Sequence, residues 1–244
     1  MRIIKYLFKI IIFNILSIKP FAKIYYIYFN LTAKKRRRND RYYISSKKTI
    51  EQHIFPEINH LLLNKKSISL LDVGCGPDIF NNVLIHKDYN KKIKQELTDK
   101  FPSLNKTIVK KSFKYLFKDN SEKYIEDFFK HNNFQSNDLT KNLINKNYDL
   151  IISVYVIEHF NQNELDFFLK NIKTLCNKFI FIVNFTDEFF SDKWTLQNDK
   201  YKFQFLKYSD FLWSLINNRF LFQSRKRIPD YIDLFENHGF KINK

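Results

Sequence analysis

The chain has 244 residues, of which 44% are hydrophobic and 18% aromatic, and its formal net charge is +17. This length accommodates one α/β domain with an extension but not two ordinary domains, and the apolar content excludes disorder as the general state. The two cysteines, Cys75 and Cys176, supply neither a disulfide framework nor a metal-ligand cluster, which is typical of a reducing compartment such as the cytoplasm.

The positive charge is spread along the whole chain, mostly as lysine. The one concentrated run, residues 34–38, contains no aromatic residues that would stack on bases, and no nucleic-acid-binding motif accompanies it. We therefore expect a solvated basic surface and no specific nucleic-acid partner.

Residues 1–33 are unusually apolar, although four lysines interrupt them. The uncharged stretches are shorter than the roughly 20 residues that cross a bilayer, and no signal-peptide cleavage site follows them. Two interpretations stay open: helices packed on the domain that follows, or a helix in the membrane interface with the basic run against anionic headgroups. We expect residues 1–48 to form a helical N-terminal extension. Its residues 1–38 are the candidate peripheral contact with the inner face of the membrane, and residues 49–244 form the main domain.

Short hydrophobic runs alternate with helix-spaced apolar residues along the rest of the chain. This alternation predicts parallel crossovers and an α/β sheet. The strongest strand covers residues 148–156, and Gly239 follows the last helix in the position of a C-cap. In chain order we expect a helix at 50–63, a strand at 67–73, a helix at 79–85, a strand at 93–98, helices at 106–117 and 121–132, a strand at 148–156, a helix at 163–175, a strand at 178–185 and a helix at 228–238.

The chain holds only three glycines, and two of them, Gly74 and Gly76, directly follow the strand at 67–73. This placement indicates a backbone that needs positive φ or close approach by a ligand, at the carboxyl end of a strand where ligands of parallel sheets bind. A dinucleotide fingerprint would put a third glycine at Ile79, and no Gly-Lys-Ser/Thr follows as in a P-loop. The pattern therefore favours a nucleoside-type ligand other than a dinucleotide.

Residues 69–77, Ser-Leu-Leu-Asp-Val-Gly-Cys-Gly-Pro, resemble motif I of the class I S-adenosylmethionine-dependent methyltransferases. The resemblance implies a Rossmann-like doubly wound sheet and S-adenosyl-L-methionine as cofactor. It also implies that Gly74, Cys75 and Gly76 lie against the methionyl part of this cofactor, with Asp72 near its amino group. The chain departs from the family at Asp78, where a further glycine is frequent.

The resemblance extends downstream of this motif. Asp99, which stands 23 positions after Gly76, would accept hydrogen bonds from the ribose hydroxyls, with Glu96 as the competing candidate. Asp138 lies where the family contacts the adenine. The strand at 148–156 resembles the fourth strand of the family, which Glu158 and His159 follow at the rim of the active site, and Glu158 is therefore a further cofactor-binding candidate.

The C-terminal third is similar to a group of bacterial methyltransferases found in cell-surface polysaccharide clusters, with Glu188 and Ser224 as departures. The resemblance implies that residues 186–227 form a substrate-facing insertion. The family has two further strands after the fifth, but residues 239–244 leave room for one short strand only, so we expect either an abbreviated sheet edge or an edge covered by other segments. His159 is the first candidate for a general base, because its unperturbed pKa lies near neutrality, and Asp187 is the second. Three arginines are candidates for holding an anionic acceptor: Arg219, Arg225 and Arg227.

The function expected from the sequence is methyl transfer to a small-molecule or glycan acceptor, as O-methylation of a sugar or a related cell-surface precursor. The alternative is a catalytically inactive domain of the same fold, attached to a membrane or a complex through its N-terminal extension. The sequence leaves the oligomeric state open.

Overall fold

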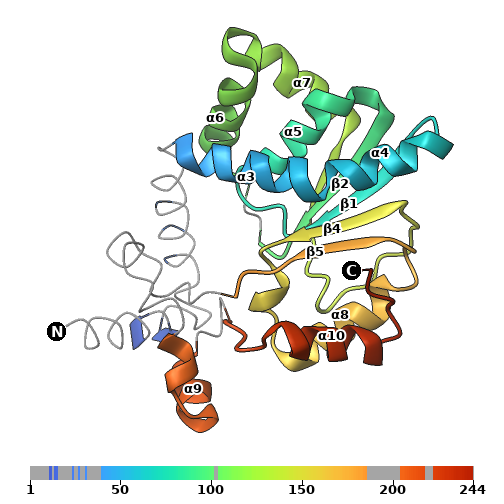
Figure 1. Cartoon of the computed structure of the whole chain (residues 1–244). Helices are drawn as coiled ribbons and strands as arrows, with labels where there is room; N and C mark the ends of the chain where they lie inside the picture. The colour runs from blue at the N-terminus through green and yellow to red at the C-terminus, as the bar shows by residue number, and fades with distance from the viewer. Residues whose placement is uncertain are drawn as a thin grey trace. The chain divides into compact units, whose positions relative to one another are not determined.

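A computed structural model describes residues 11–12, 14–15, 24, 27, 31, 40–101, 104–185, 204–217 and 222–243, and all structural statements below concern these residues (Figure 1). The chain divides into two compact units, which are described separately. The sheet unit comprises Asn30–Val156 and Lys170–Ile182, and the second unit comprises Met1–Phe29, Ile157–Leu169 and Val183–Lys244.

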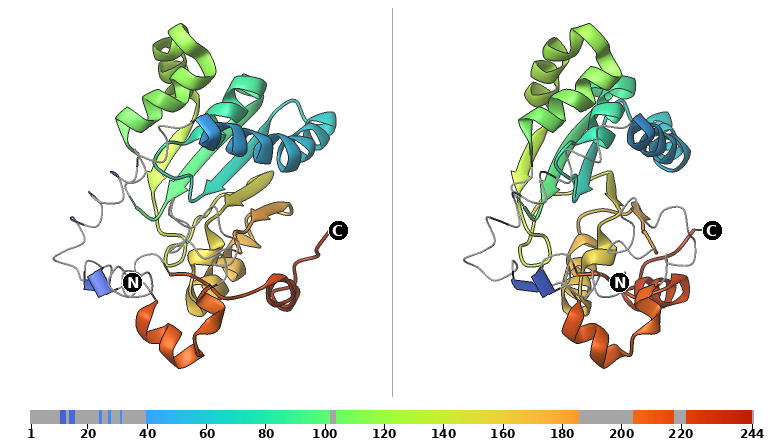
Figure 2. Two further views of the ribbon diagram at one scale, coloured as in Figure 1. Left: turned by 60° about the vertical axis from the view of Figure 1, so that its left-hand side comes forward. Right: turned by 90° about the vertical axis from the view of Figure 1, so that its left-hand side faces the viewer.

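The sheet unit is built on five parallel strands in the order β3-β2-β1-β4-β5. The chain places β2 and β3 on one side of β1 and then returns to place β4 and β5 on its other side, which is the doubly wound topology. Figure 2 shows these strands from two further directions. The elements of this unit are α3 (Asp40–His53), α4 (Phe55–Asn64), β1 (Ile68–Val73), α5 (Phe80–Tyr89), η2 (Asn90–Lys92), β2 (Ile93–Asp99), α6 (Lys106–Phe117), η3 (Lys118–Asn120), α7 (Ser121–His131), β3 (Asn133–Ser136), β4 (Leu150–Val154) and β5 (Phe179–Ile182).

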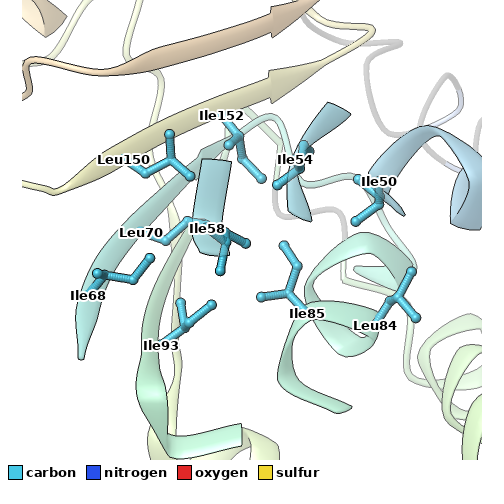
Figure 3. Close-up of a cluster of buried hydrophobic side chains, with 10 residues drawn as sticks. All are labelled: Ile50, Ile54, Ile58, Ile68, Leu70, Leu84, Ile85, Ile93, Leu150 and Ile152. Atoms are coloured by element: carbon cyan, nitrogen blue, oxygen red, sulfur yellow. The ribbon is translucent and has the colours of Figure 1, made fainter. Parts of the chain in front are cut away.

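One face of the sheet packs on α3, α4 and α5 through a cluster of branched aliphatic side chains (Figure 3). Alternate residues of a strand point to the same face, so Ile68 and Leu70 of β1 enter this cluster together. Its members are all buried: Ile50, Ile54, Ile58, Ile68, Leu70, Leu84, Ile85, Ile93, Leu150 and Ile152. This packing fixes the strands whose carboxyl ends form the candidate site.

The amino ends of β1 and β4 are joined by Asp149. Its carboxylate accepts hydrogen bonds from the backbone N–H of Ser69 at 2.7 Å and from the Ser69 hydroxyl at 2.9 Å, and it forms an ion pair with Lys65. These contacts lie at the end of the sheet opposite to the glycine loop. They set the register of the two central strands.

The second unit contains η4 (Ile157–His159), the first eight residues of α8 (Gln162–Ile172), η6 (Gln204–Lys207), α9 (Asp210–Ile216) and α10 (Ile228–Asn237). The Ser209 hydroxyl caps α9 by accepting from the N–H of Leu212 at 3.3 Å. Gly239 ends α10 with φ of +74°, and its N–H donates to the carbonyl of Glu236 at 2.8 Å, as the sequence predicts for a C-cap.

The predicted α/β architecture is confirmed, and α6 has the predicted bounds. The single helix expected at 50–63 is wrong, because α3 ends at His53 and α4 begins at Phe55. Pro56 in the first turn of α4 cannot donate a backbone hydrogen bond, and its ring disfavours a continuous helix at this point. Helix α3 also begins ten residues earlier than expected, at Asp40, so the predicted boundary between residues 48 and 49 falls inside it.

Strand β3 and helix α9 are absent from the sequence-based expectations. Strand β3 has only four residues, three of them exposed, so it lacks the hydrophobic pattern of a strand. Within the described residues β5 forms one edge of the sheet. None of the helices in these residues is both long and apolar enough to cross a membrane.

Candidate cofactor site

The candidate site lies at the carboxyl ends of the central strands. The direction of strand addition reverses between β1 and β4, and ligands of open α/β sheets bind outside the carboxyl ends at such a reversal. The chain leaves β1 at Gly74 and leaves β4 at Tyr155. These two residues therefore flank the place where the fold accommodates a ligand.

Gly74 is required by packing and by backbone conformation. Its φ is +76°, and a Cβ at this position would lie 2.4 Å from Cγ2 of Val156. The N–H groups of Gly74 and Cys75 both donate to the carbonyl oxygen of Thr98, at 2.8 and 3.1 Å. The start of the loop is thus fastened to β2 and covered by the residue that follows β4.

The backbone conformation at position 76 requires a glycine, and the space that a side chain of this residue would occupy is open. Its φ is +72°, and a Cβ there would meet no atom within 4 Å. Its N–H donates to Oδ2 of Asp99 at 3.0 Å, while Oδ1 of the same carboxylate accepts from the N–H of Phe101 at 2.9 Å. Asp99 therefore orders the loop and the end of β2 together, and a ligand can approach the backbone of Gly76 closely.

Three carboxylates surround this loop. Burial raises the pKa of Asp72 to about 7, with a further contribution from the negative charge of Asp99, while the buried amide of Asn82 partly offsets the increase. Burial also raises the pKa of the Cys75 thiol, and the negative charges of Asp72, Asp99 and Asp78 add to the effect. Asp72 and Asp78 are both buried. The loop is thus a region of negative charge that suits a cationic ligand.

Of the two ribose candidates, Asp99 ends β2 beside Gly76, whereas Glu96 lies within the strand. The Glu96 carboxylate forms an ion pair with Lys146, and its charge contributes, after burial, to raising the pKa of Tyr148. Glu96 thus belongs to a packed ion pair away from the strand end.

Asp138 lies close to the end of β2. The N–H of its neighbour Asn137 donates to the carbonyl of Asp99 at 3.0 Å, so the chain after β3 returns to the end of β2. Oδ1 of Asp138 accepts from the N–H of Thr140 at 3.1 Å and from the Thr140 hydroxyl at 2.6 Å. Its carboxylate stabilises a turn, and its predicted contact with adenine stays a prediction.

Two residues without glycine's freedom adopt a left-handed backbone at this end of the sheet. Ile79, the residue before α5, has φ of +45°, and Tyr155, after β4, has φ of +60°. This region is unfavourable for side chains with a Cβ, and strained residues concentrate at functional sites. Tyr155 is missing from the sequence-based candidates, because the strand was expected to continue through Val156 and no motif marks the turn.

In the second unit, Glu158 and His159 lie in η4. The Glu158 side chain is 1% exposed, and its Oε1 accepts from the N–H of Asn184 at 2.9 Å, while its carbonyl accepts from the N–H of Ser224 at 2.7 Å. Nδ1 of His159 lies 2.8 Å from the carbonyl oxygen of Phe222. Because a carbonyl only accepts, Nδ1 carries the proton and Nε2 is the basic nitrogen of the neutral ring.

A protein-family model described as "methyltransferase domain" matches residues 46–244. The chain belongs to this family. It is a class I methyltransferase domain with S-adenosyl-L-methionine as its cofactor. Among curated proteins, none matches the sequence.

Several solved structures of methyltransferases match the chain at low sequence identity. The S-adenosylmethionine-dependent methyltransferase SibL is 14% identical with a TM-score of 0.46, and the alignment covers 74% of this chain and 48% of SibL. The CurJ carbon methyltransferase is 16% identical with a TM-score of 0.44, covering 73% and 43%. The O-methyltransferase of a trans-AT multienzyme of Brevibacillus brevis is 16% identical with a TM-score of 0.37, covering 59% and 46%. The chain thus spans less than half the length of each of these three proteins.

The loop of this methyltransferase domain fits the cofactor in charge and in space. S-adenosylmethionine carries a sulfonium and an ammonium, and the buried carboxylates of Asp72, Asp78 and Asp99 surround the loop. The open space above Gly76 permits contact between the loop backbone and the cofactor. The cofactor-binding roles of Asp72, Gly74, Cys75, Gly76 and Asp99 stay predictions for this chain, with a geometry that suits them.

Two arginines of the predicted acceptor site, Arg225 and Arg227, lie within the described residues, and both donate hydrogen bonds to backbone carbonyls. Nη1 of Arg225 donates to the carbonyls of Phe205, at 3.2 Å, and Tyr208, and its guanidinium pairs with Asp210. Nη1 of Arg227 donates to the carbonyl of Phe185 at 2.9 Å. The guanidinium groups of Arg225 and Arg227 therefore connect backbone segments within the second unit. Their binding of an anionic acceptor stays a prediction. Asp187 and Arg219 lie outside the described residues.

Proposed function

We propose that this methyltransferase domain transfers a methyl group to a hydroxyl oxygen of a small-molecule or glycan acceptor. The observation that carries the proposal is the contact between Nδ1 of His159 and the carbonyl oxygen of Phe222 at 2.8 Å. The hydrogen bond from Nδ1 to the carbonyl of Phe222 orients the ring, and in its neutral form Nε2 is the nitrogen that would take a hydroxyl proton. A carboxylate acceptor would need no such base, so a histidine oriented in this way favours a hydroxyl acceptor.

In this proposal Asp72 and Asp99 bind the cofactor, and His159 accepts a proton. When bound, S-adenosylmethionine supplies a methyl group on a positively charged sulfur, which makes the methyl carbon electrophilic. The Asp99 carboxylate, which ends β2 beside Gly76, would accept hydrogen bonds from the ribose hydroxyls. Asp72 offers a carboxylate to the ammonium group, and His159 accepts the acceptor's proton at Nε2. Alignment of the two reactants supplies much of the rate.

The acceptor class rests on the resemblance of the C-terminal third to methyltransferases of polysaccharide clusters. A sugar of a cell-surface precursor presents several hydroxyls of similar acidity, so positioning by residues 186–227 would select the oxygen. This segment includes η6 and α9, where Tyr208 and Asp210 border a hollow of the second unit together with Arg225 and Lys226. The charges around this hollow are mixed, as suits a hydroxylated acceptor better than a strongly anionic one.

Calorimetric titration of the full chain with S-adenosylmethionine and S-adenosylhomocysteine tests the cofactor, with Gly76→Arg as the variant that fills the space above the loop. We expect wild-type binding and none by the variant.

Transfer is then measured with methyl-labelled cofactor and a panel of sugar nucleotides and oligosaccharides. His159→Gln is expected to reduce transfer by about 10²- to 10⁴-fold without altering cofactor affinity. Absence of wild-type binding contradicts the proposal, and binding without transfer to any acceptor favours the inactive alternative.

We also propose that the N-terminal segment contacts a membrane surface peripherally. The described residues at 11–12, 14–15, 24 and 27 are helical, and the side chains of Ile11, Ile15, Ile24 and Ile27 are exposed. Exposed isoleucines one helical turn apart are suited to an interfacial helix. The full chain should sediment with vesicles rich in phosphatidylglycerol, and replacing these four isoleucines by serine should abolish sedimentation. Leu63→Ser, at an exposed leucine of α4, is the control that should sediment like the wild type.

A further inference from the structure

Tyr155 combines an unfavourable backbone with an exposed ring at the carboxyl end of β4. Its φ is +60°, and its N–H donates to the carbonyl of Ile182 at 2.7 Å, which fixes this conformation against β5. Glycine, or an asparagine, adopts a left-handed backbone at less cost than an aromatic residue. The backbone alone therefore gives no reason for a tyrosine here.

Packing gives no reason either. The side chain of Tyr155 is 46% exposed, while Ile151, Ile152 and Ser153 of the preceding strand, β4, are buried. The residue that covers the loop is its neighbour Val156, whose methyl groups occupy the space beside Gly74. Tyr155 thus presents an aromatic surface to solvent at the edge where the fold binds its ligand.

The order of the strands indicates which part of a ligand would meet this ring. Asp99 ends β2 on one side of β1, and Tyr155 follows β4 on the other side. A ligand whose ribose contacts Asp99 and which crosses the loop at Gly76 would carry its far end toward β4. The buried carboxylates around the loop, among them Asp72 and Asp78, favour a positive charge on that ligand. An aromatic face attracts such a charge through its quadrupole.

We propose that the ring of Tyr155 contacts the sulfonium end of S-adenosylmethionine and makes the site prefer this cation over the neutral product S-adenosylhomocysteine. The inference rests on the proposed function, since it requires the cofactor to bind at the Gly74–Gly76 loop. Tyr155 is then a specificity residue that promotes release of the product after each transfer.

The test is calorimetric titration of wild type, Tyr155→Phe and Tyr155→Leu with each of the two ligands. Phenylalanine keeps the aromatic face, so we expect the ratio of the two affinities to stay within about twofold of wild type. Leucine removes the face and should lower affinity for S-adenosylmethionine by about three- to tenfold, with less than a twofold change for S-adenosylhomocysteine. Equal losses for both ligands, or an unchanged ratio in Tyr155→Leu, would overturn the inference. If wild type binds neither ligand, the proposed function fails first.

A second variant separates this role from a structural one. Tyr155→Asn relieves the left-handed backbone and should raise the Tm while it abolishes the preference for the sulfonium. Lys118→Gly is the control at a second residue with positive φ, because Lys118 follows α6 with φ of +53° and ψ of −122°, which glycine adopts at less cost than lysine, and it lies in η3, outside the proposed site. It should raise the Tm and leave both affinities unchanged. A lowered Tm in Tyr155→Asn would show that the ring stabilises the fold, which contradicts the inference.

Discussion

Val156 occupies the space that a side chain at Gly74 would need, with Cγ2 placed 2.4 Å from the position of a Cβ. Gly76, two residues later in the same loop, has nothing within 4 Å of its own Cβ position. The two glycines of one motif are therefore required for different reasons. Gly74 permits two segments of the sheet unit to pack, and Gly76 permits a ligand to approach.

Gly74→Ala should lower the free energy of unfolding by about 2–4 kcal/mol, because it adds a clash with Val156 to the cost of a left-handed alanine. Val156→Ala in the same chain removes the clashing methyl groups and should recover part of this loss. Urea unfolding of both single variants and the double variant gives the coupling. Strictly additive losses would show that Val156 does not cause the effect.

Gly76→Ala should cost only about 1–2 kcal/mol of stability, since the new methyl group meets no protein atom and only the backbone conformation is penalised. Its methyl group enters the space expected to hold the cofactor, so affinity for S-adenosylmethionine should fall at least tenfold. Urea unfolding and calorimetry on the same preparation measure the two effects. A fully folded variant with wild-type affinity would exclude the space above Gly76 from the site.

Cofactor binding should weaken as the pH falls through about 7. Burial holds the pKa of Asp72 near this value, so the carboxyl becomes protonated and neutral on acidification and no longer attracts an ammonium group. We expect affinity to fall by up to tenfold per pH unit below about 7, and Asp72→Asn to bind weakly at every pH. Calorimetry between pH 5.5 and 8.5 measures this profile. An affinity of wild type that does not vary with pH would contradict the role of Asp72.

The buried carboxyl group of Asp72 should also make the fold less stable at high pH. Its pKa is raised on folding from 3.8 to about 7, so the folded chain binds the proton more tightly and stability declines as the pH rises from about 4 to about 7. The full shift corresponds to about 4 kcal/mol. Asp72→Asn should therefore be more stable than wild type above pH 7 and should lose this part of the pH dependence. Unfolding free energies of both proteins at pH 5 and pH 8 test the sign.

His86 should make the fold less stable at low pH, the opposite of the effect expected for Asp72. Burial lowers its pKa, while the hydrogen bond between its Nε2 and Asp127, at 3.1 Å, acts against the decrease. The unfolded chain then takes up this proton more readily, so the contribution of His86 to stability is lost as the pH falls below about 6.5. His86→Gln should flatten the acid limb of the stability profile, and Asp127→Asn should steepen it. A steeper limb in His86→Gln would contradict this assignment.

The glycine loop and the alternation of elements could be predicted from the sequence because both depend on local pattern. Four of the five strands lie within about three residues of the bounds that the sequence predicts, and α6 lies at its predicted position. The division between α3 and α4 depends on Pro56, whose effect on a helix is also local and could have been anticipated. Strand β3 could not, since its residues are polar and only the pairing with β2 makes it a strand.

The parts of the candidate site that escaped prediction depend on contacts distant in sequence. No pattern indicates that Asp99 accepts from Gly76 and Phe101 at once, or that the chain turns left-handed at Tyr155. Arg225 and Arg227 show the converse case. Their charge suggested ligand binding, but only the tertiary structure reveals the carbonyl oxygens to which they donate.

The two hydrogen bonds accepted by Asp99 have a kinetic consequence. Because the carboxylate ties the N–H groups of Gly76 and Phe101 together through contacts within the protein, the loop needs no ligand to hold this conformation. Association should then be a single collision-limited event, with an observed rate that rises linearly with ligand concentration and no plateau from a slow ordering step. In Asp99→Ala the untied loop would have to find its conformation during each encounter, and the rate would saturate.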